Sequence, residues 1–99
     1  MAGPFDKWTN LRAETEQARL DFIRADLDLC LTFATVAETA YSMGHREHAE
    51  RTIAEAEQGY SDMLRYFSQA KGMTAEVESE LQSKFQHLRE RLDGLPRLE

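Results

Sequence analysis

The spacing of glycine and proline limits most strongly how this chain can fold. Neither residue occurs between Pro4 and Gly44, and the stretch from His45 to Lys71 is interrupted only by Gly59. Glycine and proline are the residues that most often end a helix, so stretches of this length favour long helices. We therefore predict helices over residues 6–43, 45–71 and 74–93, after an irregular or disordered start over residues 1–5.

Composition supports an all-α fold. The chain has 99 residues, with eleven Leu but only two Val and two Ile, and β-branched residues are those that sheets prefer. A chain of this length builds one hydrophobic core, so residues 1–99 are expected to form a single helical domain. Residues 98–99 (Leu-Glu) are treated as a possible remnant of a purification tag and carry no weight in this prediction.

Two apolar stripes run along the first predicted helix, at spacings of three, four or seven residues. The first stripe contains Trp8, Leu11, Thr15, Ala18, Phe22, Ala25, Leu29, Val36, Ala40 and Met43. The second contains Leu20, Ile23, Leu27, Leu31, Ala34, Ala37 and Tyr41. The later half of the helix is thus apolar around most of its circumference and should be covered on more than one side. Residues 7–19 carry few apolar side chains, and the sequence leaves open whether they project, fray or fold back.

Short breaks separate the helices and set their expected arrangement. Gly44 lies at the first turn, and a connection this short makes the first two helices antiparallel neighbours. Gly59 indicates either a close approach between helices or a slight bend. Gly72 ends the second helix, and Thr74 is a suitable N-cap for the third. The sequence therefore predicts an antiparallel three-helix bundle with a long first helix.

One ladder of residues across the first turn resembles a tetratricopeptide-type (TPR) repeat. Its members are Phe33, Val36, Ala37, Ala40, Gly44, Ala49, Ile53, Ala56 and Ser61. Two positions depart from the family pattern, because Ala40 stands where Tyr or Leu is usual and Ser61 where Pro is common. The resemblance covers one unit, residues 33–61, and implies a closely packed TPR-like helical hairpin. The chain is also similar to short uncharacterised bacterial three-helix proteins, a likeness that implies a fold and no activity.

Charge and cysteine content restrict the classes of partner. Twelve Lys and Arg stand against 18 Asp and Glu, and a net charge of −6 disfavours binding to nucleic acid or anionic membranes. The single cysteine, Cys30, lies between two leucines and is expected to pack as a small apolar group. The sequence also has no stretch that reads as a signal peptide or membrane span, so we expect a cytoplasmic protein.

Four aromatic or apolar residues are candidates for an interaction site. Tyr41 and Tyr66 each lie off the main stripe of their helix, while Trp8 and Leu11 lie on a mostly polar helical segment. An exposed aromatic side chain is a common anchor in protein interfaces. We expect a non-enzymatic interaction module that binds a protein partner or forms a homo-oligomer, with no cofactor.

A metal- or ligand-binding role is the alternative. His45 and His48 share a helix face, and Glu47 lies between them in the sequence. The spacing matches neither the His-Glu-x-x-His nor the Glu-x-x-His motif of known metal sites. No nucleophile motif or phosphate-binding glycine loop is present in the sequence, so catalysis is not expected.

Overall fold

Three helices make up the computed structural model, which describes residues 4–96 and the side chains of residues 15–96. They are α1 (Pro4–Ser42), α2 (Arg46–Gln69) and α3 (Ala75–Asp93), and the described residues contain no strand. The prediction of an all-α chain with three helices is therefore confirmed. The α1 helix begins at Pro4, so it includes two residues that were expected to precede it, because proline fits the first helical position.

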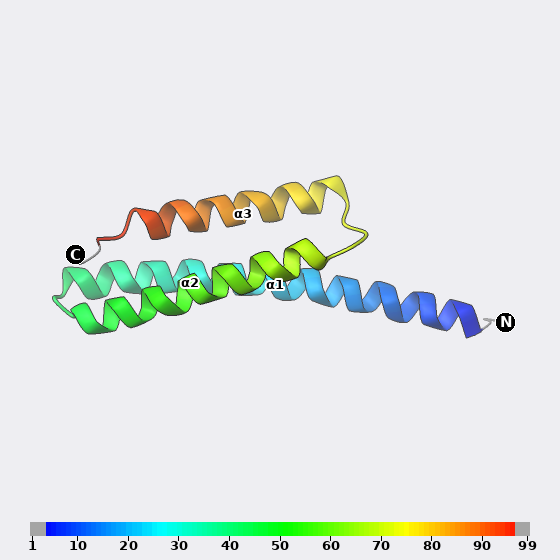
Figure 1. Ribbon diagram of the computed structural model, residues 1–99, viewed down its shortest axis with the longest axis horizontal. Helices are drawn as coiled ribbons and strands as arrows, with labels where there is room; N and C mark the ends of the chain where they lie inside the picture. Colours follow the sequence, from blue (N-terminus) through cyan, green and yellow to red (C-terminus); the bar gives the residue numbers. More distant parts are fainter. Residues whose placement is uncertain (1–3, 97–99) are drawn as a thin grey trace.

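The three helices lie side by side along the long axis of the molecule (Figure 1). The molecule measures 64 × 22 × 18 Å, and α1 spans most of the longest dimension. The first turns of α1 extend past the ends of α2 and α3 (Figure 1). Of the three alternatives left open for residues 7–19, the structure has the projecting one for the turns before Glu16, as an uninterrupted continuation of the helix, while Glu16 and Arg19 contact the α2–α3 connection.

The helix ends follow from the residues that the sequence places there. Gly44 and Gly72 have φ angles of 79° and 73°, a left-handed conformation that glycine adopts without strain. The Thr74 side chain accepts a hydrogen bond from the backbone N–H of Val77 and caps α3. The predicted roles of Gly44 and Thr74 are confirmed. The prediction that Gly72 ends the second helix is wrong, because α2 already ends at Gln69 with Ala70 in an extended conformation, and Gly72 lies within the α2–α3 connection.

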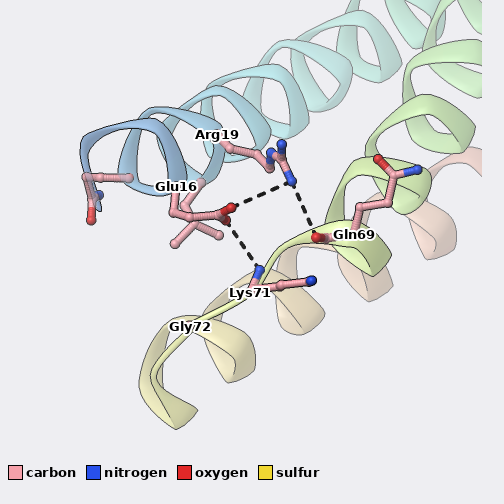
Figure 2. Close-up of a pocket in the computed structure, with 7 residues that line it drawn as sticks. Glu16, Arg19, Gln69, Lys71 and Gly72 are labelled. Carbon is pink, nitrogen blue, oxygen red and sulfur yellow. Dashed lines mark hydrogen bonds and ion pairs between the residues drawn. The ribbon is translucent and has the colours of Figure 1, made fainter. Parts of the chain in front are cut away.

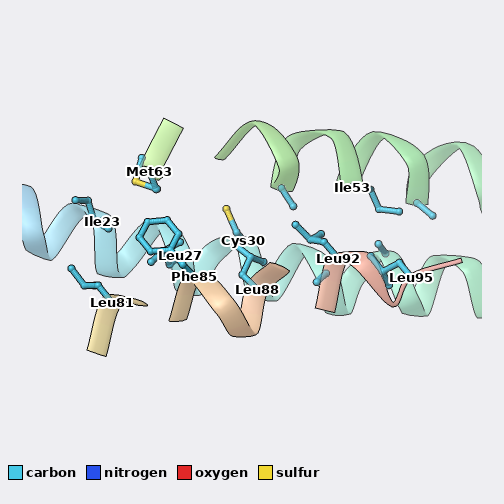
Figure 3. Close-up of a cluster of buried hydrophobic side chains, with 14 of the residues drawn as sticks. Ile23, Leu27, Cys30, Ile53, Met63, Leu81, Phe85, Leu88, Leu92 and Leu95 are labelled. Atoms are coloured by element: carbon cyan, nitrogen blue, oxygen red, sulfur yellow. The ribbon is translucent and has the colours of Figure 1, made fainter. Parts of the chain in front are cut away.

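The core is formed by the second apolar stripe of α1 and the facing residues of α2 and α3 (Figure 3). Ile23 and Leu27 of α1 and Leu81, Leu88 and Leu92 of α3 are completely buried. Phe85 of α3 contacts Tyr60 and Phe67 of α2 edge-on, with ring centroids 5.7 and 5.3 Å apart. These side chains supply the apolar burial that holds the helices together.

Small residues bring α1 and α2 close together. Ala34 and Ala37 of α1 and Ala49 and Ala56 of α2 are completely buried. A Cβ atom added at Gly59 would lie 2.6 Å from the Cys30 Sγ atom. Gly59 therefore lies where the two helices approach closely, which is one of the two alternatives, close approach or slight bend, that the sequence left open.

Ion pairs on the surface connect α3 to its two neighbours. Arg24 of α1 forms a bidentate pair with Glu80, with N–O distances of 2.8 and 2.9 Å. Arg89 of α3 forms another with Glu57 of α2, at 2.8 and 2.6 Å. Paired contacts of this kind fix the register of α3 more strongly than single exposed ion pairs do.

Candidate interaction surface

Among the side chains that the structure describes, those of the first apolar stripe of α1 are largely exposed. Its large members Phe22, Leu29, Val36 and Met43 keep 53%, 47%, 37% and 63% of their surface accessible. We call these four residues the α1 stripe. They follow one another at intervals of seven, three on α1 and Met43 directly after its last residue, so they form a single line that the chain's own core does not use. The later half of α1 was expected to be covered on more than one side. Both α2 and α3 pack against it and bury most of the second stripe together with Ala40, while the four large residues of the α1 stripe remain exposed.

Small residues lie beside the α1 stripe. Ala25, Thr32 and Thr39 each stand three residues after a stripe position, Ala18 stands four residues before Phe22, and all four are exposed. A residue three positions further along lies on the same helix face. Large apolar and small side chains thus alternate along this surface. They form ridges and grooves against which another helix can pack closely.

Tyr66 extends this surface onto α2. Its ring meets Phe22 edge-on, with a centroid distance of 6.0 Å and an interplanar angle of 77°. The Arg65 guanidinium lies 5.7 Å from the centre of the same ring. Tyr66 was predicted to present an aromatic face, and it is 37% exposed, beside the α1 stripe.

A shallow groove of about 330 Å³ lies at the hairpin end of the same surface. Val36 and Met43 of the α1 stripe contribute to its lining, together with His45 and His48. The groove is therefore continuous with the α1 stripe and combines apolar walls with two imidazole groups.

The metal-site residues are only partly brought together. His45 and His48 line this groove, whereas Glu47 lines a different hollow with Glu50, Arg51 and Ala54. Within residues 15–96 no group of three or more His, Cys, Asp or Glu side chains is placed to hold a metal ion. A metal site at His45 and His48 stays a prediction, and its third ligand is not identified.

The other candidate residues have different surroundings. Tyr41 is half-buried and packs against the core, so its ring forms part of the fold. The side chains of Trp8 and Leu11 lie outside the described residues. The sequence prediction of the site missed the α1 stripe, although the seven-residue spacing that marks it is visible in the sequence.

A second, wider hollow of about 800 Å³ lies where α1 passes the connection between α2 and α3 (Figure 2). Arg19 donates a hydrogen bond to the Gln69 carbonyl oxygen at 3.3 Å, and the Lys71 backbone N–H donates one to Glu16 at 3.3 Å. Four polar groups of the lining therefore bond to one another: the Glu16 carboxylate, the Arg19 guanidinium, the Gln69 carbonyl oxygen and the Lys71 backbone N–H. They connect α1 to the α2–α3 connection, which is a structural role.

Two ionisable groups, buried Cys30 and half-buried Asp26, lie along the contact between α1 and α2. Burial raises the pKa of the Cys30 thiol to about 11, and the Asp26 carboxylate adds to this rise. Burial also raises the pKa of Asp26, with a further contribution from the charge of Asp62. A thiol with a raised pKa is a poor nucleophile, so Cys30 acts as a core residue.

Comparison with known proteins does not assign this surface to a family. Comparison of the chain with protein-family models, with curated proteins and with solved structures finds no match. None of the described helices is both long and apolar enough to cross a bilayer.

Proposed function

We propose that this chain is a non-enzymatic helical module that binds another polypeptide through the α1 stripe. The observation that carries the proposal is the exposure of Phe22, Leu29, Val36 and Met43 in one line. Burial of apolar surface contributes about 25 cal/mol per Å², so covering these four side chains would stabilise a complex. Scattered exposed apolar residues are common, but large apolar side chains repeated at seven-residue intervals along one face are typical of a helix–helix interface.

The proposal includes an antiparallel bundle whose α1–α2 hairpin is TPR-like. Three cross-helix contacts support it: Phe22 meets Tyr66, Cys30 lies near Gly59, and Arg19 reaches Gln69. The buried alanines at 37, 49 and 56 also occupy positions where the TPR pattern has small residues. In this arrangement the core holds α1 rigidly by one face, and the opposite face is offered to a partner.

A matched pair of variants tests the proposed function. Leu29→Gln removes an apolar side chain from the α1 stripe, and Leu64→Gln makes the same change at another exposed leucine. Leu64 lies about 200° around α2 from Tyr66, on the other side of that helix. Both variants should keep the helical circular dichroism of the parent, because both positions are exposed.

Association is then measured in two ways. Sedimentation across a dilution series reports self-association, and quantitative pull-down with the intact chain reports other polypeptides. We expect Leu29→Gln, and not Leu64→Gln, to lose the association that the parent chain makes. A parent chain that is monomeric and captures the same proteins as Leu29→Gln would contradict the proposal.

A further inference from the structure

Acidic side chains border the α1 stripe on the face where Phe22 and Leu29 lie. Asp21 and Asp28 directly precede these two residues, and their side chains are 57% and 55% exposed. Asp26 lies on the other side of the stripe, near Cys30. No Lys or Arg occurs between Arg24 and Arg46, so α1 carries no basic side chain along most of the stripe.

The edge of α2 next to the stripe adds further negative charge. Asp62 is close enough to Asp26 for their charges to interact. His48, Glu55 and Asp62 follow one another at intervals of seven and therefore lie along one face of α2. His48 lines the groove with Val36 and Met43. Arg65 pairs with Asp62 at 3.3 Å and balances one of these charges, and no ion pair of Glu55 or Asp26 is found among the described residues.

From this charge pattern we infer that the partner of the α1 stripe is an amphipathic helix with Lys or Arg beside its apolar face. This inference rests on the proposed function and names the chemistry of the partner. Large side chains at seven-residue intervals are the pattern that packs against a second helix. The stripe runs from residue 22 to residue 43, about 32 Å of helix, so the partner segment needs about six turns.

Charge complementarity favours this partner over a second copy of the chain. In a two-fold dimer with parallel α1 helices, Asp21, Asp26 and Asp28 would face the same acids of the other chain. With antiparallel α1 helices they would face the other end of the stripe, where α1 has no Lys or Arg. Each chain also has a net charge of −6, which adds to the repulsion. A basic helix would instead place cations beside these carboxylates. The Asp21–Arg24 and Asp28–Lys84 pairs leave both carboxylates more than half exposed and able to accept a further donor.

Two synthetic peptides test the inference directly. Both are helical, about three heptads long, with Leu at the first and fourth heptad positions. One carries Lys at the positions that flank the leucines, and the other carries Glu there. Binding to the full chain is measured by calorimetry at low and at moderate salt. We expect the Lys peptide to bind at least about tenfold more tightly than the Glu peptide, with a preference that weakens as salt rises.

Variants of the chain locate the binding surface. Leu29→Gln should weaken binding of the Lys peptide at least about tenfold, while Leu64→Gln should leave it unchanged. A triple variant, Asp21→Asn with Asp26→Asn and Asp28→Asn, should reduce the preference for the Lys peptide while the Glu peptide binds no worse. Circular dichroism of each variant shows that the fold is retained.

The outcomes separate this inference from the proposed function. If both peptides bind equally well and Leu29→Gln abolishes this binding, the inferred preference for a basic partner is wrong, but the proposed interaction surface is supported. A parent chain that dimerises, with Leu29→Gln monomeric, would overturn the inference in favour of a second copy. Binding of the Lys peptide that is unaffected by Leu29→Gln would overturn the inference by placing the contact elsewhere. No peptide binding together with a monomeric parent chain that captures no partner would contradict both proposals.

Discussion

At the scale of single residues, Gly59 determines how closely α1 and α2 approach. A methyl group at this position would lie 2.6 Å from the Cys30 Sγ atom and 3.4 Å from an Asp26 carboxylate oxygen. The first distance is shorter than a normal van der Waals contact, so either side chain or helix must shift. Glycine costs about 1 kcal/mol relative to alanine inside a helix, and here the close approach compensates for that cost.

We therefore expect Gly59→Ala to lower the free energy of unfolding by about 1–2 kcal/mol, because overpacking outweighs the gain in helix propensity. Cys30→Ala removes the Sγ atom that the new methyl group would meet. In the Cys30→Ala background, Gly59→Ala should be neutral or stabilising by up to about 1 kcal/mol. Urea unfolding of all four chains measures the coupling. Equal effects of Gly59→Ala in both backgrounds would mean that Cys30 does not limit the approach.

Asp26 gives a prediction about pH. Its pKa is raised by burial and by Asp62, so the folded state binds a proton at Asp26 more tightly than the unfolded state does. That contribution to stability is present at acid pH and is lost as the pH rises through the raised pKa. Asp26→Asn should thus be more stable than the parent at neutral pH, and the difference should shrink as the pH is lowered.

Thermal unfolding of both chains between neutral and acid pH measures this difference. Asp21→Asn is a suitable control, because Asp21 is exposed and pairs with Arg24. A difference between parent and Asp26→Asn that does not change with pH would argue against ionisation as the cause.

At the scale of the elements, α3 depends on a small set of buried side chains. Phe85 is 5% exposed and contacts two aromatic rings of α2, whereas Phe33 of α1 is only half-buried. Phe85→Ala should lower the free energy of unfolding by about 3–4 kcal/mol, through lost burial and the cavity that remains. Phe33→Ala should cost clearly less. Denaturant unfolding checks both values, and equal losses would show that burial does not set the cost.

The elements were largely predictable from the sequence, because Gly44 and Thr74 act locally at the helix ends, although α2 ends at Gln69, before Gly72. The sequence did not predict which of the two apolar stripes of α1 is buried in the core. Phe22 and Leu29 have the same periodicity as buried residues such as Ile23 and Leu27, and periodicity shows that a face is apolar without showing what covers it. The approach of Cys30 to Gly59 depends on how two helices pack, which no local pattern contains. The α1 stripe was therefore missed as a candidate interaction site, because its exposure depends on how the helices pack.

At the scale of the whole molecule, α1 is much longer than the helices that pack against it. Its first turns extend past α2 and α3 (Figure 1), and isolated helical turns are marginally stable in water. Backbone amides of α1 before Glu16 should therefore exchange hydrogen at least about tenfold faster than those between Ile23 and Ala37. Hydrogen exchange followed by mass spectrometry measures this contrast. Equal protection along α1 would indicate that another molecule, or a second copy, covers the projecting turns.

The two stripes of α1 share one continuous helix, and this has a consequence for chain length. Each inserted or deleted residue rotates everything on one side of it by about 100° relative to the rest. A deletion between Phe22 and Met43 would thus move core and surface side chains out of register at the same time. Homologous chains with this architecture should accordingly vary in length at the α2–α3 connection, residues 70–74, and keep the span from 22 to 43 free of gaps.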